Sequence, residues 1–212
     1  MTSGGYDTVV LDLGNVLVGW DPARALTEEM TPQEWERFAE AADFRSLNLA
    51  ADAGMPIADV AARAAALDPA HGRTLSRYFA NFAATLTGPV PGTTAVVEEL
   101  AAAGIRLLGL TNWSAETFHH AAGAAPVIDL LEGVVVSGRE GVAKPDPAVF
   151  RIVLERYGVE ASRAVFVDDS PANVAGAEAV GLTALRFTDA ATLRADLHGL
   201  GLLGPGLHGR TS

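Results

Sequence analysis

The chain contains no cysteine. This absence excludes disulfide bonds and thiolate metal sites, and it is typical of proteins in a reducing cytosol. Positive charge is also scarce, because 15 lysines and arginines stand against 26 acidic residues and give a formal net charge of -11. Binding to nucleic acid or to an anionic membrane depends on clusters of basic side chains, so we expect neither partner. An anionic small molecule would have to be attracted by local positive charge.

Long apolar runs and targeting signals are missing as well. No stretch is apolar for long enough to span a bilayer, and the first residues show no charged region followed by an apolar core and a cleavage site. We therefore expect a soluble, cytoplasmic protein. The 212 residues, of which 49% are hydrophobic and 19% charged, are enough for a folded globular protein with a sizeable core.

Strand and helix patterns alternate in the second half of the chain. Helices are predicted over residues 93–103, 114–122, 147–157, 171–180 and 190–197. Strands are predicted over residues 9–11, 105–110, 133–137, 164–167 and 182–187. Helices of about ten residues between buried strands indicate βαβ units and a parallel sheet, which the N-terminal strand must join.

The segment between the first strand and this alternating region favours helices throughout and shows no strand pattern. Asp21-Pro22 and Thr31-Pro32 are typical helix starts, and Glu34 follows the threonine at the spacing of a capping box. Helices are predicted over residues 23–30, 44–51, 57–67 and 69–86.

Two glycines and two prolines within residues 88–92 mark the end of this helical segment. We therefore predict a helical domain at residues 20–87, inserted into a domain formed by residues 1–19 and 88–198. The glycine-rich residues 199–212 show no periodicity and are predicted to be a flexible tail.

Carboxylates follow two of the predicted strands directly. Asp12 comes after the first strand, and the pair Asp168-Asp169 comes after the strand at residues 164–167. Ligands of open α/β sheets bind at the carboxyl ends of the strands, so these acids are expected to face a site. Two adjacent carboxylates repel each other unless a cation lies between them, and hard divalent ions such as Mg²⁺ prefer oxygen ligands. Simple turn or capping roles remain the alternative for each acid.

Two further residues are candidates for contacts with phosphate. Thr111 follows a strand and precedes Ser114, a candidate helix N-cap, so its hydroxyl would lie at an anion-binding helix N-terminus. Lys144 precedes Pro145, which favours an extended backbone and holds the ammonium on a rigid loop as a point charge for phosphate. The alternatives are ordinary capping for Thr111 and a solvated surface position for Lys144.

The ordered set Asp12, Thr111, Lys144 and Asp168-Asp169 resembles the motifs of the haloacid dehalogenase (HAD) superfamily. The resemblance covers almost the whole chain. It implies an α/β fold, with a Rossmann-like parallel sheet core, helices on both faces and an inserted all-helical cap at residues 20–87. It also implies a magnesium-dependent phosphatase acting on a small phosphorylated metabolite. Members with a similar Asp-Leu-Gly-Asn-Val motif suggest a sugar phosphate as one candidate substrate.

The resemblance also implies a role for each motif residue. In similar enzymes the first aspartate attacks phosphorus and forms an aspartyl-phosphate that water later hydrolyses. Carried onto this sequence, Asp12 is the nucleophile, while Thr111 and Lys144 hold the phosphoryl oxygens. Magnesium would be held by four residues, which are Asp12, Gly14 through its backbone carbonyl, Asp168 and Asp169.

Gly14 departs from the family pattern, because many family phosphatases carry an aspartate there that protonates the leaving group. General acid–base help is worth about 10²- to 10⁴-fold in rate. Asp21 is a candidate substitute, although its position before a proline also fits a simple N-cap. Trp20, Asn112 and Trp113 are expected to contact the substrate.

Three other functions fit parts of the pattern. A 2-haloacid dehalogenase would use the same Asp12. However, the resemblance implies that dehalogenases of this superfamily need no metal and have small polar residues where this chain has Asp168-Asp169. A receiver-type phospho-acceptor combines similar residues, but in a different order and a shorter chain. A degenerate family member that binds without catalysis would explain Gly14. The sequence leaves open whether the chain forms a homodimer.

Overall fold

The computed structural model describes residues 5–204. At its centre lies a five-stranded parallel sheet, with the strand order β5-β4-β1-β6-β7. The strands are β1 (Thr8–Leu11), β4 (Arg106–Thr111), β5 (Gly133–Val136), β6 (Ala164–Asp168) and β7 (Thr183–Arg186). The predicted parallel sheet is therefore confirmed, and β1 is its middle strand. All four residues of β1 are buried, as expected for a strand covered on both faces.

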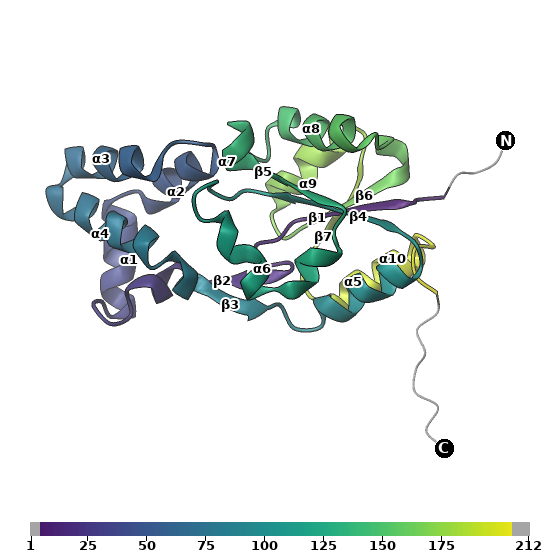
Figure 1. Ribbon diagram of the computed structural model, residues 1–212, viewed down its shortest axis with the longest axis horizontal. Helices are drawn as coiled ribbons and strands as arrows, with labels where there is room; N and C mark the ends of the chain where they lie inside the picture. The colour runs from purple at the N-terminus through teal and green to yellow at the C-terminus, as the bar shows by residue number, and fades with distance from the viewer. Residues whose placement is uncertain (1–4, 205–212) are drawn as a thin grey trace, which may run out of the picture.

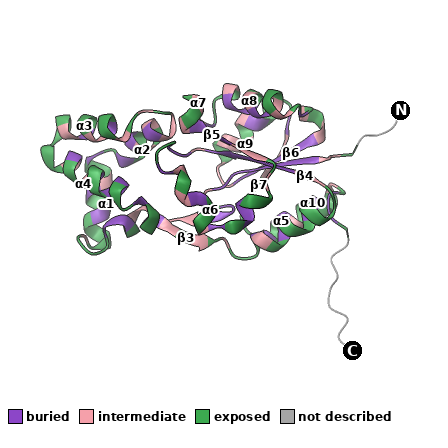
Figure 2. Cartoon of the chain, viewed as in Figure 1, coloured by how far each residue is buried: buried purple, intermediate pink, exposed green. Residues whose placement is uncertain are grey.

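Helices cover both faces of the sheet (Figure 1). Alternation along β1 directs Val10 to one face, where it packs with α8 (Pro147–Tyr157) and α9 (Pro171–Glu178). Val9 belongs to the core of the other face, with α5 (Thr93–Ala102) and α10 (Ala190–Gly199). Figure 2 shows the buried residues concentrated on the sides of these helices that face the sheet.

Four helices form a group beyond one end of the sheet (Figure 1). They are α1 (Pro32–Ala41), α2 (Phe44–Asp52), α3 (Ile57–Leu67) and α4 (Pro69–Ala80). The capping box expected at the start of α1 is present. The core of the group is aromatic, and the ring of Tyr78 lies 5.9 Å from that of Trp35 and 4.9 Å from that of Phe44. We call α1–α4 the helical group.

The ends of the helical segment differ from the prediction. Strands β2 (Val18–Trp20) and β3 (Leu86–Pro89) pair in an antiparallel ribbon that connects the helical group to the sheet domain. The helix expected at 23–30 is only the 3-10 helix η1 (Pro22–Leu26), and the one expected at 69–86 stops at Ala80 before the 3-10 helix η2 (Phe82–Thr85). The ribbon joins segments far apart in sequence, and neither strand is long enough to show a period of its own.

The helix predicted over residues 114–122 is also wrong. Ser114 accepts a hydrogen bond from the backbone of Glu116, only two residues on, and so forms a turn. The 3-10 helix η3 (Phe118–His120) and the short helix α6 (Ala121–Ala124) follow. The side chain of Glu116 instead accepts a 2.7 Å hydrogen bond from the first backbone N–H of α3, the Ile57 amide. This contact joins the helical group to the sheet domain.

The remaining elements are short. They are η4 (Pro126–Leu130), α7 (Ser137–Glu140) and η5 (Ala161–Arg163). Part of the segment predicted to be a flexible tail is packed, because Leu202 and Leu203 are buried in the core. The rest of that prediction, at residues 205–212, lies outside the described residues. Within the described part of the chain, no helix has the length and apolar character needed to cross a membrane.

Candidate active site

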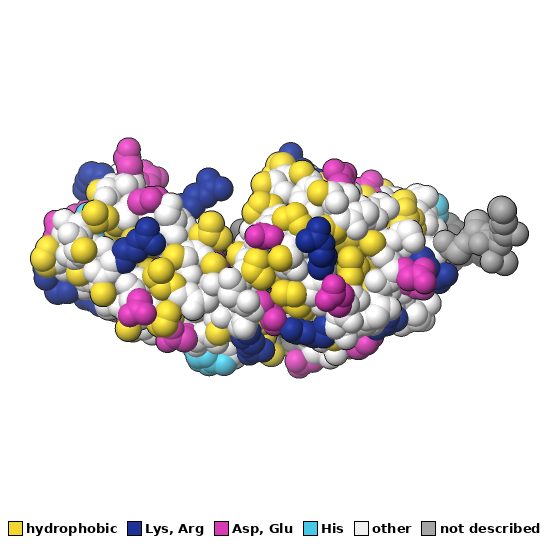
Figure 3. Space-filling model, turned by 90° about the horizontal axis from the view of Figure 1, so that it is seen from above, with side chains coloured by type: hydrophobic (Ala, Val, Ile, Leu, Met, Phe, Trp, Pro, Cys, Tyr) yellow, Lys and Arg dark blue, Asp and Glu magenta, His cyan; other side chains and the backbone are white. Residues whose placement is uncertain are grey.

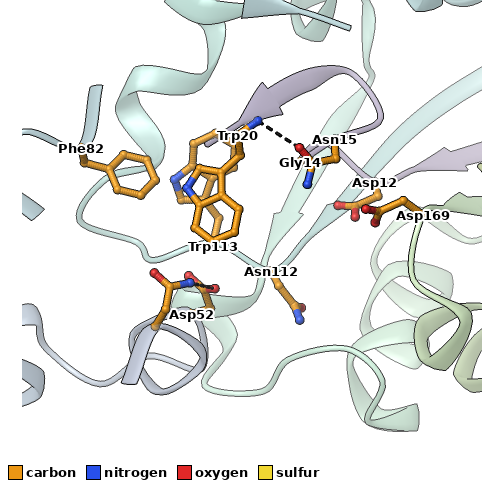
Figure 4. A pocket seen from close by; sticks show the side chains of 10 residues that line it. Asp12, Gly14, Asn15, Trp20, Asp52, Phe82, Asn112, Trp113 and Asp169 are labelled. Carbon is orange, nitrogen blue, oxygen red and sulfur yellow. Dashed lines mark hydrogen bonds between the residues drawn. The ribbon is translucent and has the colours of Figure 1, made fainter. Parts of the chain in front are cut away.

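A pocket of about 200 Å³ opens where the carboxyl ends of the strands meet the helical group (Figure 4). Loops after β1, β4 and β6 supply one wall, and α2 and η2 supply the other. Its lining residues are Asp12, Gly14, Asn15, Trp20, Asn48, Asp52, Phe82, Asn112, Trp113 and Asp169. The pocket therefore lies at the edge of the sheet where the sequence predicts a site.

Asp12 extends β1 into this pocket. Its backbone N–H donates a 2.8 Å hydrogen bond to Val167, which holds it beside the end of β6. Its Oδ1 atom accepts hydrogen bonds from the Leu13 backbone at 2.7 Å and from Lys144 Nζ at 2.8 Å. Burial raises the pKa of Asp12 to about 7, although the Lys144 ammonium opposes that rise and Asp168 adds to it. Among residues 5–204, both of these donors to the Asp12 carboxylate contact Oδ1, and neither contacts Oδ2.

Lys144 is the only lysine of the chain, and its side chain is fully buried. Its Nζ lies 2.8 Å from Asp12 Oδ1 and 2.7 Å from Asp168 Oδ2, and it donates to the Leu110 carbonyl at 2.9 Å. Burial lowers the pKa of Lys144, but the two carboxylates outweigh this and raise it above its ordinary value. The solvated alternative is thus excluded, and Lys144 is a charged group at the base of the site.

The acid pair divides into an inner and an outer carboxylate. Asp168 is fully buried and accepts hydrogen bonds from Lys144, from the Ser170 backbone at 2.8 Å and from the Asn173 amide at 3.0 and 3.1 Å. Asp169 is half-buried and lines the pocket, and burial together with Asp168 raises its pKa. Asn173 on α9 therefore steadies the inner acid.

Asp12, Asp168 and Asp169 form a cluster suited to a cation. Each offers a carboxylate oxygen, and these oxygens lie within 4.8 Å of one another. Three carboxylate oxygens at this spacing fit a hard divalent ion. Gly14, expected to add its backbone carbonyl, lines the same pocket. The residues present could therefore hold a metal where the sequence predicts one.

The family model of haloacid dehalogenase-like hydrolases matches residues 6–181. The chain belongs to the HAD-like hydrolase family. Among curated relatives of this hydrolase, a sesquiterpene phosphatase of Aspergillus oryzae is 27% identical over 194 residues, which cover 87% of this chain and 91% of the relative. A phosphoglycolate phosphatase of Rhodospirillum rubrum is 39% identical over 122 residues, but the match covers 54% of this chain and 49% of the relative.

Solved structures share the fold of this HAD-like hydrolase. A HAD family enzyme from Bacteroides thetaiotaomicron superposes with a TM-score of 0.70 at 20% identity, over 87% of this chain and 95% of the other. An L-2-haloacid dehalogenase from Xanthobacter autotrophicus superposes with a TM-score of 0.66 at 20% identity, over 94% of this chain and 85% of the other. At these identities the likeness establishes the Rossmann-like HAD architecture.

Thr111 and Asn112, at the end of β4 in this hydrolase, are placed differently from what the sequence predicts. Thr111 is buried at the strand end and does not line the described pocket. Asn112 does line it, but its amide binds the backbone of Lys144 at both ends, donating at 2.9 Å and accepting at 2.8 Å. Asn112 thus positions the lysine. Trp113 and Trp20, for which substrate contacts are predicted, line the pocket.

Asp21 lies apart from the pocket. It is exposed, and its carboxylate accepts a hydrogen bond from the Ala23 backbone at 3.1 Å, as the N-cap of η1. The hypothesis that Asp21 replaces the missing acid at Gly14 gains no support from this position, because Asp21 caps η1 and is not among the residues that line the pocket. The backbone N–H of Asp21 donates a 2.8 Å hydrogen bond to the Thr85 carbonyl, directly beyond the end of the ribbon β2–β3.

Sequence reasoning missed three residues of the pocket wall that lies opposite the ends of the strands. Asn48 and Asp52 on α2 and Phe82 on η2 line the pocket. Asn15, also missed, has a left-handed backbone with φ 56°, and its side chain accepts from the Trp20 N–H at 3.0 Å, which shapes the loop after Asp12. The only local signal near Asp52 was the helix stop at Ala53-Gly54, which carries no chemistry.

Proposed function

We propose that this HAD-like hydrolase is a magnesium-dependent phosphatase that acts on a small phosphorylated metabolite through an aspartyl-phosphate on Asp12. The observation that carries the proposal is the convergence of Asp12, Asp168 and Asp169 with the buried Lys144 at one end of a small pocket. Three acids around a fixed ammonium suit a site that binds a cation and a phosphate together. Two of the relatives described above, a sesquiterpene phosphatase and a phosphoglycolate phosphatase, agree with this chemistry.

Each residue of the site has a separate role in the proposed reaction. Asp12 attacks phosphorus through Oδ2, while Lys144 keeps the attacking carboxylate in place through Oδ1. Asp12, Asp169, the Gly14 carbonyl and Asp168 would hold Mg²⁺, which supplies charge neutralisation at the phosphoryl oxygens when bound. Of the acid pair, Asp169 is the more open toward the pocket.

The helical group α1–α4 acts in this proposal as a cap over the leaving group. Its residues Asn48 and Asp52 face the pocket together with the aromatic rings of Phe82 and Trp20. A pocket of about 200 Å³ with both polar and aromatic walls suits a small leaving group. A sugar is one such leaving group, so a sugar phosphate is a candidate substrate. For any substrate of this kind, burial under the cap would keep bulk water from the site.

Hydrolytic dehalogenation is the alternative favoured by one observation, the structural likeness to a haloacid dehalogenase. Halide leaves without a proton, so the missing side chain at Gly14 would not matter. However, the carboxylates of Asp168 and Asp169 would repel a haloacid unless a cation neutralised them. The acid pair therefore favours phosphate ester hydrolysis.

The test is phosphate release from a panel of phosphate esters with and without magnesium. Wild-type protein is expected to release phosphate with magnesium and to lose activity in EDTA. Asp12→Asn should lower the rate by on the order of 10³-fold or more. Asp59→Asn, at an exposed position of α3, is the matched control and should not change it.

Two outcomes would contradict the proposal. Halide release from 2-haloacids that survives EDTA would identify a dehalogenase. Absence of any phosphate or halide release from the whole panel would identify a member that binds without catalysis.

A further inference from the structure

The attacking side of this site is complete, but its leaving-group side needs a proton donor. Gly14 has no side chain, and Asp21 caps η1 away from the pocket. Three acids line the pocket, which are Asp12, Asp169 and Asp52. The first is the nucleophile and the second a metal ligand in the proposed function. Among the lining residues, Asp52 is the acid that this function does not use.

Asp52 is held in place from both sides of the pocket. It is the last residue of α2, and its Oδ2 accepts a 2.9 Å hydrogen bond from the amide of Asn48, one turn earlier. Its backbone carbonyl accepts from Ser137 Oγ, which in turn accepts a 3.0 Å hydrogen bond from the Trp113 N–H. Trp113 is the second residue after the strand β4, and Asn112 lies between them. Asp52 is therefore tied to the sheet domain although it belongs to the helical group.

The position of Asp52 matches the geometry of phosphoryl transfer. The attacking and leaving oxygens lie roughly in line on opposite sides of phosphorus. Asp12 and Asp169 lie on one side of the pocket, and Asp52 lies on the other (Figure 4). A proton donor for the leaving oxygen has to be on the side opposite Asp12, and this is where α2 places a carboxyl group.

We propose that Asp52 is the general acid of this enzyme and protonates the leaving oxygen of the phosphate ester. The inference rests on the proposed phosphatase function. As the Asp12 Oδ2–phosphorus bond forms, the phosphorus–oxygen ester bond breaks, and the proton of Asp52 passes to the leaving oxygen to give the alcohol. Water then attacks phosphorus and gives a proton to the Asp52 carboxylate, while the Asp12 Oδ2–phosphorus bond breaks. This step regenerates the Asp12 carboxylate and protonated Asp52 and releases phosphate.

The surroundings of Asp52 keep a proton available near neutral pH. Burial raises its pKa to about 7, against the lowering effects of a hydrogen bond from the Ser114 backbone and of the Lys144 ammonium. Tyr78 faces it from α4, and burial raises the pKa of that phenol, so it stays neutral. An acid with a pKa near the working pH is suited to both proton transfers.

The test compares esters whose leaving groups differ in their need for a proton. Dinitrophenyl phosphate leaves without protonation, whereas an alkyl phosphate does not. Asp52→Asn should hydrolyse dinitrophenyl phosphate within a few-fold of wild type but lose about 10²- to 10⁴-fold on the alkyl ester. Asp59→Asn should match wild type on both esters. Retained activity on the activated ester also demonstrates that the variant is folded.

A second variant adds an independent check. A Cβ built at Gly14 meets no heavy atom within 4 Å, so the backbone position itself admits a side chain. Gly14→Asp should raise the alkyl ester rate strongly in the Asp52→Asn background and little in the wild-type background. Such non-additivity is expected when either carboxyl group can serve as the acid.

The outcomes separate this inference from the function on which it rests. Equal losses on both esters, or no loss on the alkyl ester, would overturn the role of Asp52, as would an equal gain from Gly14→Asp in both backgrounds. Failure of wild type to hydrolyse even dinitrophenyl phosphate with magnesium would overturn the phosphatase function itself.

Discussion

The buried ammonium of Lys144 offers a direct test of how the site is held together. Lys144→Met keeps the length of the side chain but removes the charge that contacts Asp12 and Asp168 at 2.8 and 2.7 Å. Both carboxylates are almost fully buried, so water cannot replace the lost partner. Breaking a buried ion pair from one side destabilises a protein by about 3–5 kcal/mol. For a chain of this size that corresponds to a decrease in Tm of roughly 6–20 °C.

The loss should depend on pH. Without Lys144 the pKa of Asp12, already raised to about 7 by burial, rises further. The folded state then holds a proton that the unfolded chain releases above its ordinary pKa of 3.8, so stability decreases as pH rises through this window. The decrease in the free energy of unfolding caused by Lys144→Met should therefore be larger at about pH 8 than at about pH 5. At the lower pH, Asp12 is protonated and one uncompensated charge is removed.

Thermal unfolding followed by circular dichroism at both pH values measures the effect. The matched control is Arg194→Met, which breaks the exposed ion pair with Glu99 and should cost no more than about 1 kcal/mol. If Lys144→Met is no less stable than this control, or if its decrease in Tm is the same at both pH values, the buried carboxylates do not need the Lys144 charge for stability. The electrostatic reasoning would then be wrong.

Three further predictions concern stability. Thr31→Ala removes the N-cap hydrogen bond to the Glu34 backbone and should cost about 1 kcal/mol in urea unfolding, with no change in the slope. Gly72→Ala places a Cβ 2.5 Å from that of Ala65 between α3 and α4, and should cost about 1–3 kcal/mol, whereas an unchanged midpoint would mean that the helices separate freely. Between pH 3.8 and about 7 the folded state retains the proton of Asp52. Stability should thus decrease as pH rises there, and an Asp52→Asn curve that is not flatter would contradict that pKa.

The sheet domain could be predicted because its signals are local. Buried strands such as β1 and β6 are short apolar runs, and Asp12 directly follows β1 while Asp168 is the last residue of β6. The rule that carboxyl ends of parallel strands share one edge then brings these acids together without knowledge of the rest of the fold. The same rule predicted the position of Asp169, which lines the pocket.

The opposite wall of the pocket could not be predicted, because long-range contacts create it. Asp52 reaches the site through the tie between its carbonyl and Ser137, which lies far along the chain. The ribbon β2–β3 likewise depends on pairing between distant segments, and Asp21 lies directly beyond its end. Neither α2 nor the ribbon contains a residue pattern that specifies its partner, so local periodicity carries no information about them.

The burial of the chain's only lysine has a consequence for the outer surface. Because Lys144 is fully enclosed, each dark blue side chain on the described surface in Figure 3 is an arginine. Acylating reagents, amine cross-linkers and enzymes that modify lysine need an accessible primary amine, and the folded protein offers them no side chain of that kind. Acylation of Lys144 in solution would therefore require the interior to open, so this side chain should be labelled far more slowly in the folded protein than in the unfolded chain.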